Sequence, residues 1–321
     1  MDYKVNQRLL SHLQRVFKAL LDGELVFFLG AGANLCGRPS GEAWMRGKYL
    51  PNSNELASYL AKEFHYPTQS QRELVRVSQY AEVMMGAAPL YNKLRYIFDA
   101  DYPPTRIHYL LAELPQILRK KGCENPFQLI VTTNYDDVLE RAFQQYDQEY
   151  DLVIYLAETD QRGKFEHYPP NGNSKIIDKP NEYLDLLLEE RSVILKIHGA
   201  IARNNPGHDS FVITEDHYID YLSRTDISSF IPLKLKEYLH NSHFLFCGYS
   251  LRDWNLRVIL QRIWGEQKLR FASWAVQVDP EELDQKYWMR RDVEILDSSL
   301  DEYVIALQEY IQSHSDSGGE S

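Results

Sequence analysis

Short, continuously apolar segments recur along the chain and predict the strands of a buried sheet. The first is LVFFL at residues 25–29, and five apolar residues in a row are typical of a strand that is buried on both faces. The other predicted strands lie at 127–134, 150–157, 192–199, 242–250 and 271–278, with a shorter one at 292–296.

Apolar residues at helical spacing fill most of the intervals between these strands. Residues 1–23 predict an amphipathic helix, and the stretch from about 53 to 118, after the first strand, predicts several helices in succession. Two more helices are predicted at 136–146 and 251–265. Because strands alternate with helices, we expect an α/β fold whose parallel sheet is covered by helices on both faces.

Two segments of the chain show little periodicity. Residues from about 158 to 183 are rich in Gly, Pro and Asn, and they predict an irregular insertion that is too long for a simple connection. Residues 314–321 contain no apolar side chain and predict a disordered tail. The length of 321 residues permits one large α/β domain or two smaller ones.

Composition and charge narrow the class of protein. With 44% hydrophobic and 25% charged residues the chain is ordinary globular material, and its net charge of −11 disfavours nucleic-acid binding through the general surface. The three cysteines form no C-x-x-C pair, which argues against a four-cysteine zinc site and fits a reducing cytoplasm. No apolar run is long enough to span a membrane. We therefore expect a cytoplasmic protein without a metal, a nucleic-acid partner or a membrane.

The ends of four predicted strands carry the residues with the most distinctive chemistry. In open parallel sheets, ligands bind beyond the carboxyl ends of the strands. At the first of these ends, Gly30-Ala31-Gly32-Ala33 suits either a tight turn or a close approach of backbone N–H groups to a phosphate. The third glycine of the dinucleotide-binding pattern G-x-G-x-x-G is absent, because Leu35 stands there. The motif alone leaves both interpretations open.

The next two strand ends carry candidate catalytic side chains. Asn134, in TTNYDD, can hold a ribose hydroxyl or a water, but Asn134 or Asp136 can equally cap the following helix. His198 ends the strand in KIHG, where a neutral imidazole can take a proton near pH 7. A lone histidine beside apolar residues is also often a packed core residue, so both interpretations of His198 stand.

The fourth strand end is Gly248-Tyr249-Ser250, a glycine followed closely by a hydroxyl residue. This combination suits a second contact to a phosphate or a ribose. Asp253, three residues further on, either caps the next helix or hydrogen-bonds a ribose.

Together and in this order, GAGAN, TTNYD, KIHG and GYS resemble the motifs of the Sir2 (sirtuin) superfamily, over about residues 25–278. TTNYDDVLERAF, DSFVITEDHYIDYL and FLFCGYSLRDWNLRVIL are similar to bacterial Sir2-like proteins of anti-phage defence. The resemblance implies one Rossmann-like NAD-binding domain over residues 1–313, with the helical insertion after its first strand. Deacylase sirtuins carry a cysteine-ligated zinc module between the histidine and Gly-x-Ser motifs. Here the interval 200–247 holds no cysteine except Cys247, so no zinc module is expected.

The resemblance also implies an activity and a set of site residues. The activity is that of an NAD glycohydrolase, which cleaves the nicotinamide–ribose bond of NAD and depletes cellular NAD in defence. Asn134 would orient the water or the ribose hydroxyls, His198 would act as general base, and Asp136 would be an orienting carboxylate or a cap. The residues implied to bind NAD are Gly30, Ala31, Gly32, Ala33, Thr133, Gly248, Tyr249, Ser250 and Asp253.

Two other functions remain compatible with the same residues. A protein deacylase without zinc would release nicotinamide only in the presence of an acylated peptide, and a non-catalytic sensor would bind NAD or ADP-ribose and gate a partner. A dehydrogenase is disfavoured because the third glycine is missing. Related proteins often work beside an NTPase or an Argonaute-type partner, and a homo-oligomer is a further expectation, but no residue of the sequence identifies either.

Overall fold

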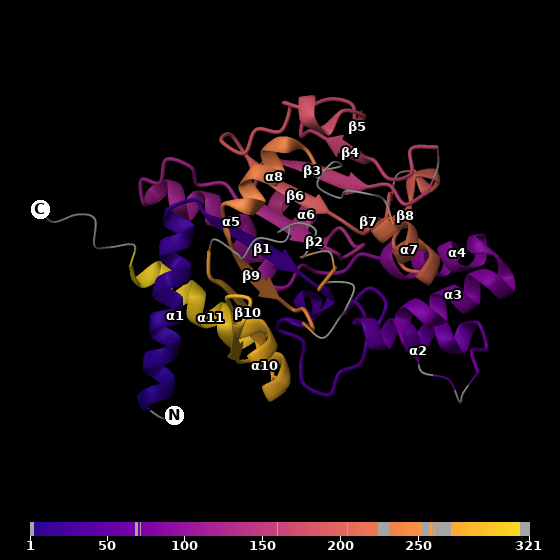
Figure 1. The fold of residues 1–321 in the computed structure, drawn as a ribbon, viewed down its shortest axis with the longest axis horizontal. Helices are drawn as coiled ribbons and strands as arrows, with labels where there is room; N and C mark the ends of the chain where they lie inside the picture. Colours follow the sequence, from indigo (N-terminus) through magenta and orange to yellow (C-terminus); the bar gives the residue numbers. More distant parts are fainter. Residues whose placement is uncertain are drawn as a thin grey trace, which may run out of the picture.

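A single sheet of nine strands runs through the molecule (Figure 1). The computed structural model describes residues 3–67, 70, 72–158, 160–203, 205–223, 231–251, 257–258, 260 and 271–314. The strands lie across the sheet in the order β11-β10-β9-β1-β2-β6-β3-β4-β5, and β7 and β8 form a separate pair. Their bounds are β1 Leu25–Leu29, β2 Leu129–Thr132, β3 Tyr150–Tyr155, β4 Phe165–Tyr168, β5 Lys175–Ile177, β6 Ser192–Lys196, β7 Gly199–Ala200, β8 Ser210–Phe211, β9 His243–Cys247, β10 Ser273–Gln277 and β11 Val293–Asp297.

The strands from β11 to β3 pair in parallel, and only β4 and β5 at one edge of this sheet are antiparallel. Leu29 lies opposite both Cys247 and Thr132, and Thr132 lies opposite Lys196. The carboxyl ends of β9, β1, β2 and β6 are therefore neighbours at one edge. This register gathers the four motifs that follow these strands, as the sequence predicted.

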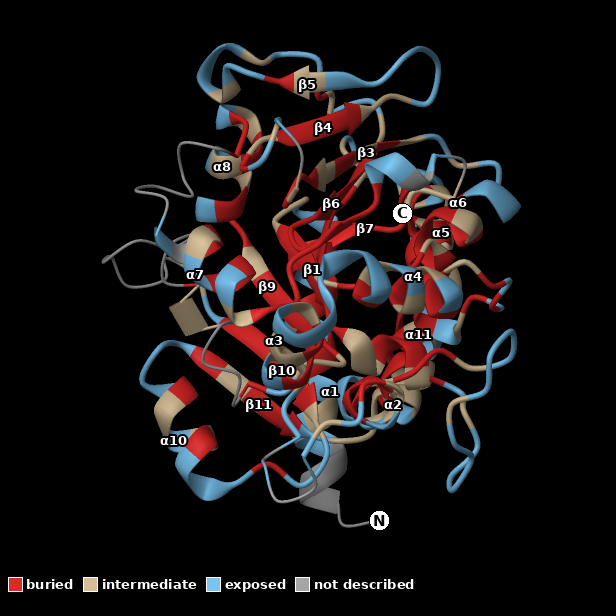
Figure 2. Ribbon diagram, turned by 90° about the vertical axis from the view of Figure 1, so that its right-hand side faces the viewer, coloured by how far each residue is buried: buried red, intermediate tan, exposed pale blue. Residues whose placement is uncertain are grey.

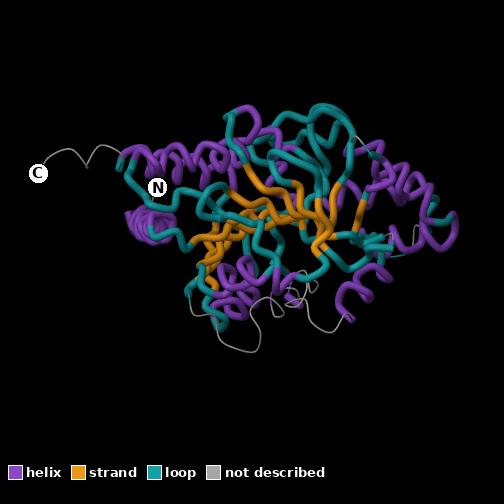
Figure 3. The backbone as a smooth tube through the Cα atoms, turned by 90° about the horizontal axis from the view of Figure 1, so that it is seen from above, coloured by secondary structure: helices purple, strands orange, loops and turns teal. Residues whose placement is uncertain are grey.

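Helices lie on both sides of the sheet (Figure 3), which confirms the predicted α/β class. The helices α1, α5, α6 and α11 share a core with one face, and α7, α8 and α10 share a core with the other. Their bounds, with α2 to α4, are α1 Tyr3–Leu21, α2 Ser53–Glu63, α3 Leu74–Met85, α4 Ala87–Phe98, α5 Arg106–Lys120, α6 Val138–Gln145, α7 Glu215–Ser223, α8 Leu233–His240, α10 Glu282–Met289 and α11 Leu300–Ser313.

The strand β1 shows why the central segments read as continuously apolar. Phe27 and Leu29 pack toward α1, α5 and α11, whereas Val26 and Phe28 pack toward the opposite face. Since both faces are covered, all five residues of β1 are buried, and the centre of the sheet is buried throughout (Figure 2). Two-sided burial of this kind favours parallel strands over the alternating pattern of a half-exposed sheet.

The helical insertion expected after β1 is present as α2, α3 and α4, followed by α5. The first three helices lie together at one end of the molecule (Figure 1). They share a third hydrophobic cluster with Tyr135 after β2, Ile201 after β7 and Phe211 of β8. The insertion is thus anchored on segments that leave the sheet at its carboxyl edge.

Three parts of the sequence prediction need comment. The segment 158–183 is not wholly irregular, because it contains β4, β5 and the 3₁₀ turn η2 (Pro180–Glu182). The strand β4 pairs with β3 and β5, and β5 forms the edge of the sheet. A Pro/Gly/Asn turn joins these two short strands, and burial of three successive residues of β4 hides any alternation. The helices α7, α8, α10 and α11 were not predicted. The helix predicted at 251–265 and the tail at 314–321 lie mostly outside the described residues.

Candidate functional site

The glycine turn after β1 packs directly against the turn after β9. The amide of Gly30 donates to the Cys247 carbonyl at 3.0 Å, and the amide of Gly32 donates to the Gly248 carbonyl at 2.8 Å. Gly248 has a φ of +70°, and a Cβ built there would lie 2.1 Å from the nitrogen of Ala33. Small residues are therefore needed here because the main chains of the turns after β1 and β9 are in direct contact. The sequence analysis did not consider this contact.

The 3₁₀ turn η1 (Ala31–Leu35) continues this contact into the protein. Ala33 and Asn34 are buried, Ala31 is half-buried, and the Ala33 carbonyl accepts a hydrogen bond from Thr105 Oγ1 at 2.9 Å. Thr105 is the N-cap residue of α5. The amide of Ala33 donates to the Gly30 carbonyl at 2.9 Å. Three amides of the turn, those of residues 30, 32 and 33, are thus engaged within the protein.

The residues after β9 and β2 meet through their side chains. Tyr249 donates a hydrogen bond to Thr133 Oγ1 at 3.0 Å, and its ring packs edge-on against Phe28 at 5.5 Å between centroids. Ser250 is exposed beside them. The structure therefore brings Thr133, Tyr249 and Ser250 to the same strand edge, whereas Asp253 lies outside the described residues.

Asn134 is buried at the end of β2 and does not serve as the helix cap. Its Nδ2 donates to the Gly30 carbonyl at 3.1 Å, and its amide donates to Thr132 Oγ1 at 3.0 Å. The helix α6 begins only at Val138, with Asp137 in the N-cap position. The side chain of Asn134 thus links the β2 loop to the glycine turn, and the capping interpretation of Asn134 is wrong.

Asp136 accepts hydrogen bonds on both oxygens of its carboxylate, and one of them comes from the first turn of α6. Its Oδ1 accepts a hydrogen bond from the Val138 amide at 3.2 Å, in the first turn of α6. Its Oδ2 accepts one from Asn34 Nδ2 at 2.8 Å. The carboxylate is only 3% exposed. It therefore fastens the loop to η1 and to α6 instead of facing solvent.

His198 is buried just beyond β6, with one ring nitrogen left without a partner. The rings of Tyr218 and Tyr221 on α7 lie edge-on to the imidazole, at 5.3 and 5.9 Å between centroids, and the Tyr218 hydroxyl is 3.5 Å from Nδ1. Nε2 has no hydrogen-bond partner among the described residues. Burial lowers the pKa of His198 to about 3, so the imidazole is neutral at pH 7.

Sequence reasoning missed three buried polar residues next to these groups. Asn34 holds Asp136, as described above, and Lys196 of β6 forms an ion pair with Glu140 of α6 at 2.6 Å. Lys196 could have been noticed, because it is the one charge within the apolar run SVILKI. For Glu140 the sequence offers no comparable signal, since charged residues are common on helices.

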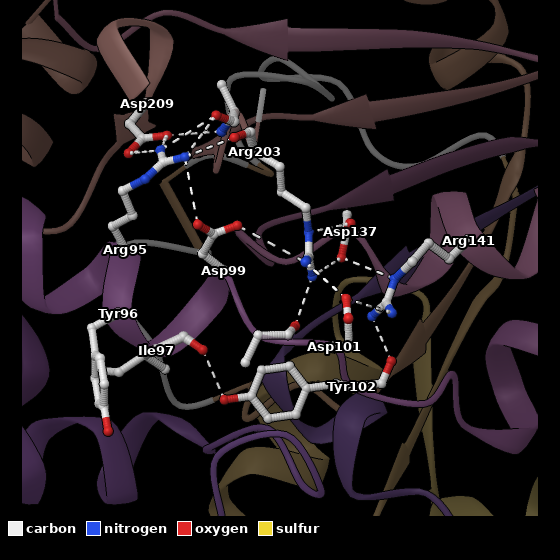
Figure 4. A network of polar contacts seen from close by, with 12 residues as sticks. Arg95, Tyr96, Ile97, Asp99, Asp101, Tyr102, Asp137, Arg141, Arg203 and Asp209 are labelled. Atoms are coloured by element: carbon white, nitrogen blue, oxygen red, sulfur yellow. Dashed lines mark hydrogen bonds and ion pairs between the residues drawn. The ribbon is translucent and has the colours of Figure 1, made fainter. Parts of the chain in front are cut away.

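A network of ion pairs surrounds Asp137, the N-cap residue of α6 (Figure 4). Asp137 lies 2.6 Å from Nε of Arg203 and 3.2 Å from Nε of Arg141. In the same network Arg95 of α4 lies 2.7 Å from Asp209. These contacts connect the helical insertion, Arg203 and Asp209 with the start of α6, which follows the loop that carries Asn134. The loop is therefore held by ion pairs at Asp137 as well as by the hydrogen bond from Asn134 to the glycine turn.

A cavity of about 450 Å³ opens beside η1, away from the strand ends. Asn34, Tyr102, Thr105 and Arg106 contribute to its wall, and neither Asn134 nor His198 does. In the described part of the chain, no three His, Cys, Asp or Glu side chains are arranged to hold a metal ion. No described helix is both long and apolar enough to cross a membrane.

The fold is that of a Rossmann-like α/β protein, and its candidate site residues follow strands at the carboxyl edge of the sheet. Residues 128–296 match the SIR2-like domain, and the chain therefore belongs to the SIR2-like domain family. This confirms the resemblance drawn from the motifs. The match includes Asn134, Asp136, His198 and the turn after β9, whereas the glycine turn at Gly30 precedes it.

The chain is also similar to three larger bacterial proteins. It is 23% identical over 292 residues to defense-associated sirtuin 2 of Bacillus subtilis, covering 89% of this chain and 24% of the relative. It is 27% identical over 255 residues to the NAD(+) hydrolase ThsA of Acinetobacter baumannii (strain 532279), covering 78% and 41%. For the NAD(+) hydrolase ThsA of Cytobacillus dafuensis the values are 24% over 251 residues, 78% and 40%. The chain thus spans about a quarter to two-fifths of these relatives.

Proposed function

We propose that this protein binds NAD at the carboxyl edge of its sheet and hydrolyses the nicotinamide–ribose bond, giving nicotinamide and ADP-ribose. The observation that carries the proposal is that Asn134 and His198 both lie two residues beyond the ends of adjacent strands, where the Nε2 atom of His198 lacks a described partner. A buried polar atom without a hydrogen bond calls for an explanation, and a bound substrate or water supplies one. Two relatives that carry the name NAD(+) hydrolase support the choice of substrate.

The glycine turns are proposed to receive the pyrophosphate of NAD. Because the amides of Gly30, Gly32 and Ala33 already donate within the protein, small side chains here act by allowing close approach more than by supplying donors. Thr133, Tyr249 and Ser250 would contribute hydroxyl groups for the riboses or phosphates. Ala31, Gly248 and Asp253 complete the proposed contact set.

The proposed reaction needs a base but no acid. Water attacks C1′ of the ribose, the bond from C1′ to the pyridinium nitrogen breaks, and its electron pair leaves with neutral nicotinamide. The transition state resembles an oxocarbenium ion, as in other glycoside cleavage. His198 Nε2 would take the proton of the water, and Asn134 would orient the water or the ribose hydroxyls. Asp136 would act as a positioning residue, since its carboxylate is already engaged by Asn34 and by α6.

In the structure described here His198 is covered. Tyr218 and Tyr221 pack against its ring, and the imidazole is 4% exposed. The Nε2 atom is buried as well, so we expect a resting state that substrate binding or assembly opens. We also propose that the protein acts in the cytoplasm as a defence effector. A second copy of the chain, an NTPase or an Argonaute-type partner remain expectations from family resemblance.

Incubation of the purified protein with NAD tests the proposal. We expect equal amounts of nicotinamide and ADP-ribose by chromatography, without any added peptide, and no products from the Asn134→Ala variant. A second arm adds an acetylated peptide, because strict dependence on this peptide would favour the deacylase instead. NAD binding by calorimetry without product, across a range of protein concentrations, would favour the sensor and contradict the hydrolase.

A further inference from the structure

A buried ion pair lies against the loop that carries Asn134. Lys196, the last residue of β6, is 1% exposed, and its Nζ lies 2.6 Å from Oε1 of Glu140. The same ammonium group donates a hydrogen bond to the main-chain carbonyl of Asp136. Lys196 therefore connects β6 both to the loop after β2 and to the helix α6 that follows it.

The loop of residues 134–136 is thus hydrogen-bonded both to the turn after β1 and to the end of β6. At the turn after β1, Asn134 donates to the Gly30 carbonyl and Asp136 accepts from Asn34. At the end of β6, Lys196 holds the carbonyl of Asp136, and His198 follows Lys196 by only two residues. Lys196 therefore links the loop that carries Asn134 to the segment that carries His198.

Stability alone gives a weak reason for this ion pair. Removing two charges from water is costly, and replacement of a buried ion pair by apolar residues of similar volume is often neutral or stabilising. Oε2 of Glu140 has no hydrogen-bond partner within the described chain, and burial raises the pKa of Glu140 while Lys196 opposes the rise. The cost of burying these two charges is therefore only partly offset by hydrogen bonds. Such a pair is expected where it serves to position neighbouring residues and not to stabilise the fold.

We propose that Lys196 is a positioning residue, which holds the Asn134–Asp136 loop at the distance from His198 that NAD hydrolysis requires. Glu140 neutralises the charge of Lys196 so that the ammonium group can remain buried. This inference rests on the proposed function, because it assigns Lys196 to the geometry of the proposed catalytic pair. Lys196 itself need not touch the substrate.

The test is a double variant that removes both charges together, Lys196→Met with Glu140→Leu. We expect its Tm to stay near or above that of the parent, because no unpaired charge is left behind. We expect kcat to fall by about 10–100-fold and KM for NAD to change by less than about 3-fold, since a displacement near 1 Å can cost that much turnover. An unchanged kcat, or failure of the double variant to fold, would overturn the proposal.

A control variant removes one partner of a largely buried ion pair beside the other end of β6. Arg191 lies 3.0 Å from the fully buried Asp151, and Arg191→Met should lower the Tm without changing kcat per folded molecule. A fall in kcat like that of the double variant would show a general effect of losing buried charge, and would also overturn the proposal.

A crystal structure of the double variant separates this inference from the proposed function. Displacement of Asn134 relative to His198 by about 1 Å would support positioning, and superposition of the two loops would refute it. Either result is independent of turnover. If the parent releases no nicotinamide, the proposed function fails, and the structure alone decides whether Lys196 positions the loop.

Discussion

Two buried histidines of the same sheet differ in how their ring nitrogens are satisfied. His167, on β4, has Nε2 at 2.9 Å from Asp151 and Nδ1 at 2.6 Å from the Tyr183 hydroxyl. His198, beyond β6, has Nδ1 at the limit of a hydrogen bond to Tyr218, and its Nε2 lacks a partner among the residues described. Both side chains are almost fully buried, so burial does not distinguish them.

The difference supports His198, and not His167, as the candidate for a chemical role. At the antiparallel edge, His167 joins β3 to β4 through Asp151 and reaches Tyr183 beyond β5. At the carboxyl edge, the Nδ1 atom of His198 makes one long contact with the Tyr218 hydroxyl, and its Nε2 atom has no hydrogen bond to a described residue. Buried polar atoms are normally paired. The strand edge that leaves the Nε2 atom of His198 unpaired is therefore the better candidate for a site.

The largest expected effect comes from exchanging each histidine for glutamine. His198→Gln should lower NAD turnover by about 10²–10⁴-fold, because a positioned general base is lost, with little change in Tm. His167→Gln should leave turnover per folded molecule intact and cost about 1–3 kcal/mol of unfolding free energy, because Asp151 and Tyr183 lose their partner. Nicotinamide release and urea unfolding on both variants check this contrast. Loss of turnover in the His167 variant, with turnover retained in the His198 variant, would contradict this assignment of the two histidines.

A smaller effect is expected from two glycines that share a left-handed backbone. Gly122 has a φ of +75° with nothing within 4 Å of a built Cβ, whereas a Cβ on Gly248 would lie 2.1 Å from Ala33. Gly122→Ala should cost about 1 kcal/mol from backbone strain, and Gly248→Ala about 3 kcal/mol or more, because overpacking is added. We also expect weaker NAD binding only for Gly248→Ala. Equal losses in unfolding free energy for the two variants would contradict the close contact between the turns.

The smallest effect concerns the pH dependence of stability. Burial lowers the pKa of His12 to about 4, of His108 to about 4 and of His198 to about 3, from 6.5. The unfolded chain takes up these protons as the pH falls below 6.5, and the folded protein does so only near pH 3–4. Each site should therefore lower the free energy of unfolding by about 1.4 kcal/mol per pH unit across that window. Urea unfolding at pH 7, 6 and 5 should show a shallower fall for His198→Gln than for the parent, and an identical fall would refute the burial of His198.

The sequence predicted the sheet well and the interactions between side chains poorly. Each predicted strand has a counterpart, and in β1 two-sided burial leaves a continuous apolar run. The short strands β4 and β5 were missed because they have only four and three residues and are joined by a turn-rich sequence. The contact between Gly32 and Gly248 and the ion pair of Lys196 with Glu140 join segments far apart in the chain. Such pairings depend on strand order, which periodicity does not supply.

The motifs indicated where a site would lie, but not what each residue does there. Asn134 and Asp136 were equal candidates for a cap, and only the hydrogen bonds to Gly30 and to Val138 distinguish them. The covering of His198 by Tyr218 could not be foreseen, because the sequence analysis predicted no helix at residues 215–223, where α7 lies.

The most direct measurement is NAD turnover by Asn134→Ala, His198→Gln and the double variant, with Tm determined on each. If the two residues act as one unit on the same water and ribose, each single substitution should cost about 10²–10⁴-fold. The double variant should then be little worse than the worse single variant, because residues that act together are not additive. Turnover close to that of the parent in either single variant, under conditions in which the parent hydrolyses NAD, would contradict the assignment of this strand edge as the active site.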